Sequence, residues 1–181
     1  MTVERYDVQL NAAPLEGLIQ NLDAAENAYL KVGILGDYAG RTPDETGTKR
    51  KDSDLTNPQL GLWHEFGSQK GNLPERSFLR MPILLHLGDK LKSMASPEQW
   101  KDIIVKHGFI HLLDMVGNEC IGLIADAFHT GGFGFWEKLK PRTIARKKNS
   151  DILIDTGQLQ RSITYAVVLK GSPQTPVAPL P

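Results

Sequence analysis

The longest apolar stretch of the sequence, residues 109–128, constrains the fold more than any other feature. Its length is about that of a membrane-spanning helix, but three acidic residues interrupt it, and charged side chains are costly in the hydrocarbon of a bilayer. They are Asp114, Glu119 and Asp126. Because the apolar residues recur at helical spacing, the stretch predicts the central helix of a hydrophobic core. Gly117 and Gly122 within it indicate close packing by a neighbouring element.

The composition is typical of one water-soluble domain. The chain has 181 residues, of which 40% are hydrophobic and 23% charged, and its 21 basic and 21 acidic residues give a formal net charge of zero. Cys120 is the single cysteine, so no internal disulfide can form, which favours a reducing compartment. Its apolar neighbours predict a buried, unreactive thiol. Charged residues at the N-terminus do not fit a secretory signal.

Periodicity and capping residues predict an α+β fold, with helices packed on a small, mostly antiparallel sheet. The expected strands are residues 29–35 and 162–169, with a short extended piece at 152–154. The expected helices are residues 15–25, 60–66, 82–94, 97–104, 109–128 and 141–148, with a helical turn at 155–161. Ser96, Pro97 and Gln99 form the clearest helix start, a capping box with proline at the first position. We expect residues 1–170 to form a single domain.

Two segments are expected to extend from this domain. Residues 37–56 are rich in glycine, aspartate and threonine and have almost nothing apolar to bury, so they predict a long exposed loop. Residues 171–181 contain four prolines and no charge, which predicts an extended C-terminal arm. We expect both segments to gain order on a neighbouring molecule.

One set of residues raises the question of a metal site. His107 and His111 lie four residues apart, and they share a helix face if the helix continues through Gly108, with Glu119 downstream. A metal site needs three or four ligands that converge, and the spacing does not bring these three together. We therefore expect no metal and no cofactor, and a metal-dependent hydrolase is the least favoured alternative.

A basic run lies at residues 138–148, with Glu137 as its acidic neighbour. Its members are Lys138, Lys140, Arg142, Arg146, Lys147 and Lys148. Such a run is ordinarily a solvated helix face, but it is also able to contact DNA phosphates without sequence preference. A sequence-independent DNA-binding module is therefore an alternative function.

Two longer segments, residues 60–82 and 136–168, carry a more specific pattern. The first has a His-Glu-Phe-Gly turn followed by a proline-and-arginine segment that ends in Phe-Leu-Arg. The second has a tryptophan, a Pro-x-Thr helix and a Leu-x-Asp-Thr-Gly-x-Leu-x-x-Ser-Ile signature. In this order the pattern resembles the tailed-bacteriophage virion morphogenesis and tail-completion proteins, including HK97 gp10-like and Mu G-like proteins. Glu75 and Lys140 depart from it, because proline and a helix-capping residue are common there.

The resemblance implies three groups of functional residues. The candidate interface anchors are His64, Glu65, Phe66, Arg76, Phe78, Arg80 and Trp136. The candidate DNA-channel residues are the six bases of the run at 138–148. The structural signature is Asp155, Thr156, Gly157, Leu159 and Ser162, a capped turn that begins the last strand. For the segment from His64 to Arg80, a core turn that positions the next helix is an equally open interpretation.

The resemblance also implies a function. Proteins of this group are structural, non-enzymatic parts of the virion neck or tail top that complete the head or the tail and allow the two to join. For this chain, it implies a homo-oligomeric ring around the DNA channel, assembled in the cytoplasm of a bacterial host. The implied partners are copies of itself and the neighbouring head–tail connector and tail-tube or tail-terminator proteins, with non-specific contact to packaged DNA and no membrane. Head completion and tail completion both stay open.

Overall fold

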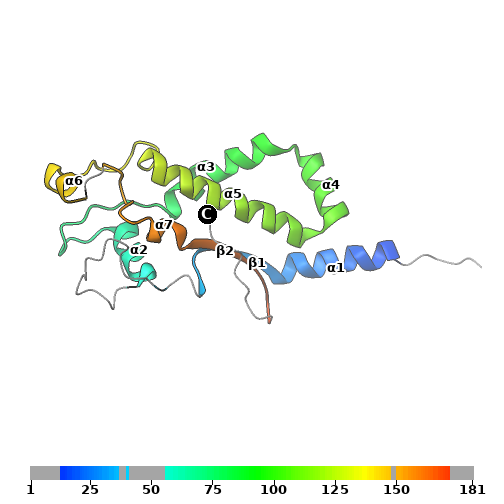
Figure 1. Cartoon of the computed structure of the whole chain (residues 1–181). Coiled ribbons are helices and arrows are strands. Elements are labelled where there is room, and N and C mark those ends of the chain that lie inside the picture. The colour runs from blue at the N-terminus through cyan, green and yellow to red at the C-terminus, as the bar shows by residue number, and fades with distance from the viewer. Residues whose placement is uncertain (1–12, 37–39, 41–55, 148–149, 172–181) are drawn as a thin grey trace, which may run out of the picture.

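A two-stranded antiparallel sheet with a long helix packed on it organises the fold (Figure 1). The computed structural model describes residues 13–36, 40, 56–147 and 150–171. The elements are α1 (Ala13–Asn27), β1 (Ala28–Ile34), α2 (Asn57–Phe66), α3 (Arg80–Met94), α4 (Pro97–His107), α5 (Phe109–Thr130), α6 (Pro141–Lys147), α7 (Gln158–Arg161) and β2 (Ile163–Leu169). The expected α+β class is confirmed. Lys148, the arm at 172–181 and nearly all of the 37–56 segment lie outside the described residues.

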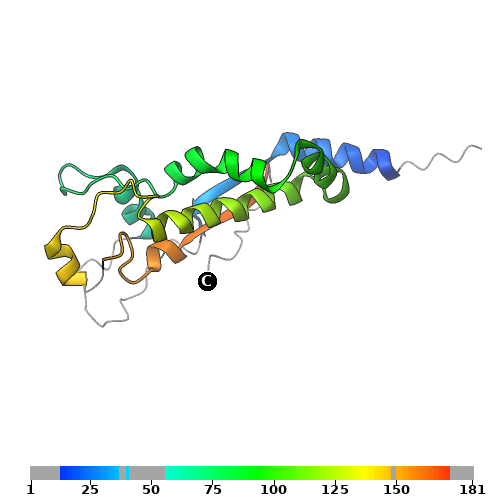
Figure 2. The ribbon, with the colours of Figure 1, turned by 90° about the horizontal axis from the view of Figure 1, so that it is seen from above.

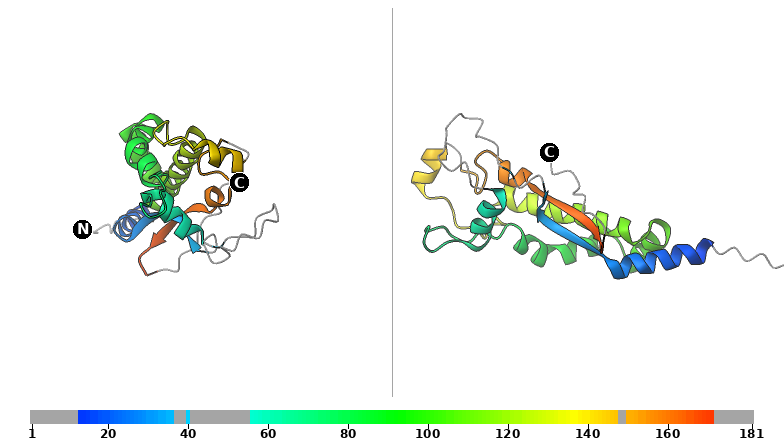
Figure 3. Two further views of the ribbon diagram at one scale, coloured as in Figure 1. Left: turned by 90° about the vertical axis from the view of Figure 1, so that its left-hand side faces the viewer. Right: turned by 90° about the horizontal axis from the view of Figure 1, so that it is seen from below.

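The sheet joins the two ends of the described sequence. β1 and β2 pair in a register that runs from Ala28 opposite Leu169 to Ile34 opposite Ile163. α5 runs along this ribbon and covers one of its faces, as the views from above and below show (Figures 2 and 3). β2 is buried on both faces over its first four residues. α5 therefore packs against one strand from the N-terminal part of the sequence and one from the C-terminal part.

The core lies along α5, as its apolar sequence predicts. Its buried cluster comprises Phe78, Ile121, Ile124, Ala127, Phe128, Trp136, Leu159, Ile163 and Tyr165. The ring of Phe128 meets the edges of Phe78 and Trp136, with centroid separations of 5.3 and 6.0 Å. Such edge-to-face pairs add about 0.5–1.5 kcal/mol each to the burial of apolar area. None of the helices in the described ranges is both long and apolar enough to cross a bilayer.

Close packing occurs at one of the two glycines that predicted it. A methyl group at Gly117 would overlap the ring of Tyr165, whose hydroxyl donates a 2.6 Å hydrogen bond to the Asp114 carboxylate. Glycine at this position thus lets β2 lie directly against α5. The expectation was wrong for Gly122, which is exposed and faces open space.

Local signals set most of the helix ends. The Ser96–Gln99 capping box is present at the start of α4, and Gly108, with φ at 89°, separates α4 from α5. α3 begins at Arg80, two residues before the expected start, because a distant side chain satisfies its first amides. Two expectations near β2 were wrong. Residues 152–154 form a bend in which Leu153 has a φ of 63°, and the helical turn begins only at Gln158.

Candidate functional site

Glu65, near the end of α2, is the centre of a hydrogen-bond network that joins α2 to α3. The residue is only 4% exposed. Its carboxylate accepts hydrogen bonds from the Ser77 hydroxyl (2.7 Å), the amides of Phe78 (2.8 Å), Leu79 (2.9 Å) and Arg80 (3.0 Å), and Arg80 Nε (3.0 Å). Five donors therefore surround one buried carboxylate.

This network supplies most of the N-terminal cap of α3, and the Ser77 hydroxyl accepts a further hydrogen bond from the Met81 amide (3.1 Å). The residue at the cap position, Leu79, has no side-chain cap hydrogen bond, and the first amides of a helix have no partners within the helix. Glu65 provides these partners from another helix. Burial raises the pKa of Glu65, but the hydrogen bonds from Leu79, Ser77 and Arg80 outweigh burial and leave the pKa below its ordinary value. The carboxylate thus stays ionised opposite the positive end of the α3 dipole.

The turn after Glu65 brings the chain back to α2. Gly67 has a φ of 70°, and a Cβ atom there would lie 2.8 Å from the Glu75 amide nitrogen, so only glycine fits. A short bridge between Ser68 and Leu73 closes the turn with two hydrogen bonds of 2.8 and 2.9 Å. The residues that follow this bridge run back alongside α2. The His-Glu-Phe-Gly motif therefore encodes a helix end, a reversal and a remote cap.

Arg76 and His64 lie behind this turn, next to the segment that contains Trp136. The backbone amide of Arg76 donates a hydrogen bond to the His64 carbonyl (2.8 Å). The guanidinium Nη2 of Arg76 donates to the Glu137 carbonyl (3.1 Å). Burial, together with the positive charges of Arg76 and Lys147, lowers the pKa of His64 to about 4. His64 is therefore neutral near pH 7. Arg76, 5% exposed, links the two motif segments.

The structure divides the seven candidate interface anchors into two groups. Four of them are buried, namely Glu65, Arg76, Phe78 and Trp136. These four make their contacts inside the chain, and the three that lie between His64 and Arg80 fit the core-turn interpretation of that segment. Phe66 is 55% exposed, and the Arg80 guanidinium lies 4.4 Å above its ring. Phe66 and Arg80 are accessible at the surface, and His64 is only partly so.

The basic run presents most of its charge to solvent. Lys138, Lys140, Arg142 and Arg146 are exposed. Lys147 is half-buried and donates a 2.7 Å hydrogen bond to the Asp151 carbonyl, and burial lowers its pKa. Lys148 lies outside the described residues. The run therefore offers four exposed cations on one segment.

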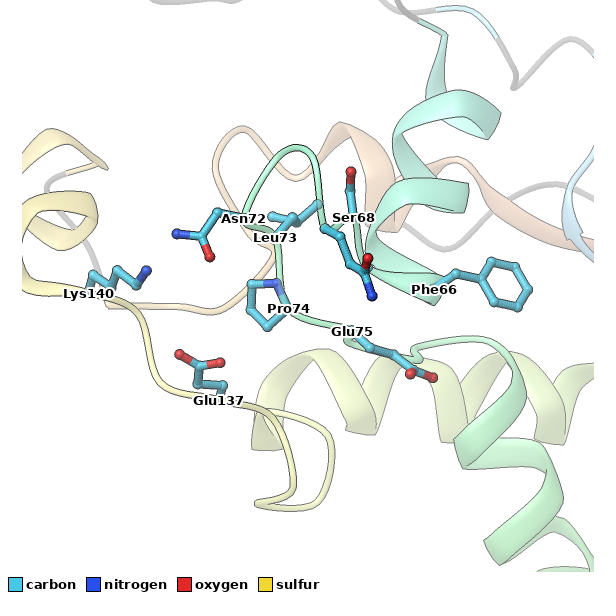
Figure 4. A pocket seen from close by; sticks show the side chains of 10 residues that line it. Phe66, Ser68, Asn72, Leu73, Pro74, Glu75, Glu137 and Lys140 are labelled. Carbon is cyan, nitrogen blue, oxygen red and sulfur yellow. The ribbon is translucent and has the colours of Figure 1, made fainter.

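A hollow of about 590 Å³ separates the turn after α2 from the start of the basic run. Its lining includes Phe66, Pro74 and Glu75 on one side and Glu137 and Lys140 on the other (Figure 4). The hollow thus makes the exposed end of α2 and the basic run parts of one surface.

The structural signature lies at the start of β2. The Ser162 hydroxyl donates a 2.7 Å hydrogen bond to the carbonyl of Leu159, which is itself 5% exposed in the core. Gly157 has a φ of 76°, and Arg161 donates a 3.0 Å hydrogen bond to the Thr156 carbonyl. Asp155 is exposed. The signature sets the direction in which β2 enters the sheet.

The alternative metal ligands do not gather into one site. The rings of His107 and His111 are 5.2 Å apart across the break at Gly108, and both residues are exposed. Glu119 follows His111 by eight residues, about 12 Å along the helix, and forms an ion pair of 3.6 Å with Lys90. Within the described parts of the chain, no group of three or more His, Cys, Asp or Glu side chains is placed to hold a metal ion.

The Cys120 thiol is buried and does not have the properties of a nucleophile. Burial, together with the charge of Glu119, raises the pKa of this thiol to about 11. A thiol with this pKa is almost entirely protonated at neutral pH, whereas nucleophilic cysteines have lowered pKa values. Cys120 is therefore part of the core, as its apolar neighbours predict.

Two exposed apolar faces, on α1 and α2, were not predicted from the sequence. Their exposed large side chains are Leu18, Ile19 and Leu22 on α1, and Leu62, Trp63 and Phe66 on α2. The periodicity of each helix was visible, but it carries no information on whether an apolar face meets its own core or another molecule. The tertiary structure decides this question.

No protein-family model, curated protein or solved structure matches this chain. The resemblance to phage tail-completion proteins therefore depends on the residues quoted for it.

Proposed function

We propose that this chain is a structural protein of the neck or tail top of a tailed bacteriophage, where it completes the head or the tail and allows the two to join. The observation that supports the proposal is the convergence of the motif segments at one end of the molecule. Glu65 holds the start of α3 at Phe78, and Arg76 hydrogen-bonds to the residue after Trp136. Phe78 and Trp136 share a core cluster with Leu159. Residues far apart in the sequence thus form one structural unit.

The chemistry of these residues favours a structural role over catalysis. Glu65 is occupied by five donors, most of them groups that it caps, so its carboxylate is committed to the fold. His64 is neutral near pH 7 because its pKa is about 4, and such a group does not exchange protons readily at neutral pH. The motif residues thus maintain the folded structure, which is what an assembly protein requires of them.

In this proposal the chain acts in the virion, in a ring of identical copies around the DNA channel, after assembly in the cytoplasm of the bacterial host. Its other partners are the head–tail connector on one side and a tail-tube or tail-terminator protein on the other. Packaged DNA passes through this ring and is contacted without reading of its sequence. The segments 37–56 and 171–181 order on neighbouring subunits. No cofactor takes part.

Electron microscopy of lysates tests the proposal directly. A phage that lacks this gene should accumulate DNA-filled heads and unattached tails as separate particles. Complementation in trans with the natural gene should restore joined, infectious virions. Joined particles of normal appearance in the absence of the gene would refute the joining role.

A sequence-independent DNA-binding module is the second candidate, and the exposed cations support it. Residues 138–147 contain five bases and no acid. If this module acts alone, the purified chain should bind duplex DNA with an affinity that falls steeply with salt, by a log–log slope of roughly 0.9 per phosphate neutralised. Substitution of Arg142 and Arg146 by alanine should then reduce the slope by about 2. The neck proposal instead expects weak or no DNA binding until the subunits are arranged in a ring.

A further inference from the structure

The apolar face of α1 points away from the core of its own chain. Leu18, Ile19 and Leu22 are 53%, 57% and 62% exposed, and their spacing places them on one side of the helix. α1 faces the rest of the chain with small and polar residues instead, among them Gly17, Asn21 and Ala24. The Asn21 amide donates to the Ile104 carbonyl (3.4 Å), and its oxygen accepts from the Phe109 amide (3.3 Å). α1 is thus docked by its small and polar side.

The same inversion occurs in α2. Its buried residues are Asn57, Gly61 and Glu65, whereas Leu62, Trp63 and Phe66 are 57%, 48% and 55% exposed. Solvent-exposed apolar patches that contain aromatic residues are typical of protein–protein contacts. α2 therefore presents a second apolar surface, and the hollow that extends from Phe66 to Lys140 has a largely polar lining.

These two surfaces lie in opposite halves of an elongated molecule. Figures 1 and 2 place α1 at one end and α6 at the other, with α2 in the half that contains α6. The right-hand view in Figure 3 agrees with this arrangement. One chain is therefore unable to bring its own α1 onto its own α2 without refolding.

The two surfaces also carry opposite charges. α1 contains Glu16, Asp23 and Glu26, all exposed, and no basic residue. Asp23 follows Ile19 by four residues and Glu26 follows Leu22 by four, so these two acids lie in line with the apolar face. The segment next to α2 exposes Lys138, Lys140, Arg142 and Arg146, against two exposed acids at the hollow, Glu75 and Glu137. The apolar face of α1 thus has an apolar counterpart on α2, and the acids of α1 have basic counterparts in residues 138–146.

We propose that α1 of one copy packs its Leu18–Ile19–Leu22 face on the Leu62–Trp63–Phe66 surface of α2 in the next copy. The acids of α1 then face the bases of residues 138–146. Because the contact joins two different surfaces, it repeats from copy to copy, and it closes into a ring if the rotation between copies allows it. The contact itself depends on the exposed faces and charges described above. Its closure into a ring rests on the proposed function.

Cysteine cross-linking with a short bismaleimide tests the contact, since the native Cys120 is buried. One variant carries Ala25→Cys on the exposed side of α1, and a second carries Leu62→Cys on α2. A mixture of the two should give a cross-linked dimer, either variant alone should not, and a chain with both substitutions should give a ladder of multimers. Ser93→Cys, exposed on α3, replaces Leu62→Cys in the matched control mixture.

Charge reversal tests the pairing of the two ends. Asp23→Lys with Glu26→Lys should lower the cross-linked yield at least about tenfold, because like charges then face each other. Arg142→Glu with Arg146→Glu should lower it similarly. A mixture of the two reversed chains, each carrying its single cysteine, should recover the yield. All four positions are exposed, and circular dichroism checks that each variant retains its helices.

Three results would overturn the proposed contact. The first is a yield no higher than that of the Ser93→Cys control, which would mean that a different protein covers these faces. The second is cross-linking of the Ala25→Cys variant with itself, which would indicate a two-fold dimer. The third is charge reversal without effect or without recovery in the mixture. The phage-deletion experiment tests the neck role separately, so a cross-linked ladder together with normal particles would retain the contact and reject the function.

Discussion

Replacement of Glu65 by glutamine isolates the contribution of the remote cap. The side chain keeps its shape and one acceptor oxygen, but the second oxygen becomes an NH₂ group, and the charge is lost. Of the five donors around Glu65, at least two then lose their acceptor. Hydrogen bonds to charged groups contribute about 1.5–3 kcal/mol each, and a buried donor without a partner costs about 1–3 kcal/mol. We expect Glu65→Gln to lower the free energy of unfolding by about 3 kcal/mol.

Glu75→Gln is the matched control, because it removes the same charge from the same arginine. Glu75 pairs with Arg80 at 3.1 Å, but their side chains are 59% and 49% exposed. Exposed ion pairs contribute about 0–1 kcal/mol, so this variant should change stability by less than about 0.5 kcal/mol. Urea unfolding followed by circular dichroism gives both values. In thermal unfolding, Glu65→Gln should lower Tm by roughly 6–12 °C.

The stabilisation by Glu65 should also depend on pH in one direction. Because the folded-state pKa of Glu65 lies below its ordinary value, the carboxylate contributes stability that is fully present above the unfolded pKa of about 4.3. This contribution is lost as the pH falls through the lower, folded pKa. The difference between the natural chain and Glu65→Gln should therefore narrow below about pH 4. Equal losses for the two glutamine variants, or a difference that does not change with pH, would refute the capping argument.

Three further predictions concern α5 and β2. Gly117→Ala should destabilise the fold by more than about 1 kcal/mol because its methyl group would overlap Tyr165. Gly122→Ala should instead stabilise the fold by about 0.5–1 kcal/mol. Equal shifts of the two urea unfolding curves would contradict the packing described for Gly117. Tyr165→Phe should cost about 1–2 kcal/mol through loss of the hydrogen bond to Asp114. Since the pKa of Tyr165 is raised to about 12, the natural chain should lose stability above about pH 10 more steeply than this variant. Cys120, with a pKa of about 11, should react with a thiol-specific disulfide reagent only in denaturant; rapid reaction in the folded state would place it outside the core.

The residues of the two motif segments indicate how this chain folds. They say less about which of its surfaces meet other molecules. Glu65, Arg76, Phe78, Trp136 and Leu159 are all buried, and each connects elements that are far apart in the sequence. A pattern built on such residues indicates how the chain packs, because substitution of any of them would disturb the core. The surfaces that meet other molecules consist of other residues, such as those on α1. This is why the resemblance supports the proposed class of protein without identifying its contacts.

Several elements could be predicted because their signals are local. The capping box at Ser96, the helix of residues 109–128 and the strand β2 are all present in the structure. Hydrogen bonds within one turn and the pairing of neighbouring side chains decide these features. The start of α3 was misplaced because its cap, Glu65, lies 15 residues before Arg80. The bend at Leu153 was missed for a related reason, since an Ile-Leu-Ile sequence favours extended backbone until tertiary packing overrides it.

The amino-acid order alone determined most of the helices and both strands, that α5 is the most apolar of them, and that the single thiol is unreactive. Tertiary structure decided the pairing of β1 with β2, the ionised carboxylate inside the helix junction, and the outward direction of the apolar faces on α1 and α2. The physical reason is the range of the forces involved. Backbone propensity and capping act over one turn, whereas the partner of a face depends on which distant surfaces exclude water together.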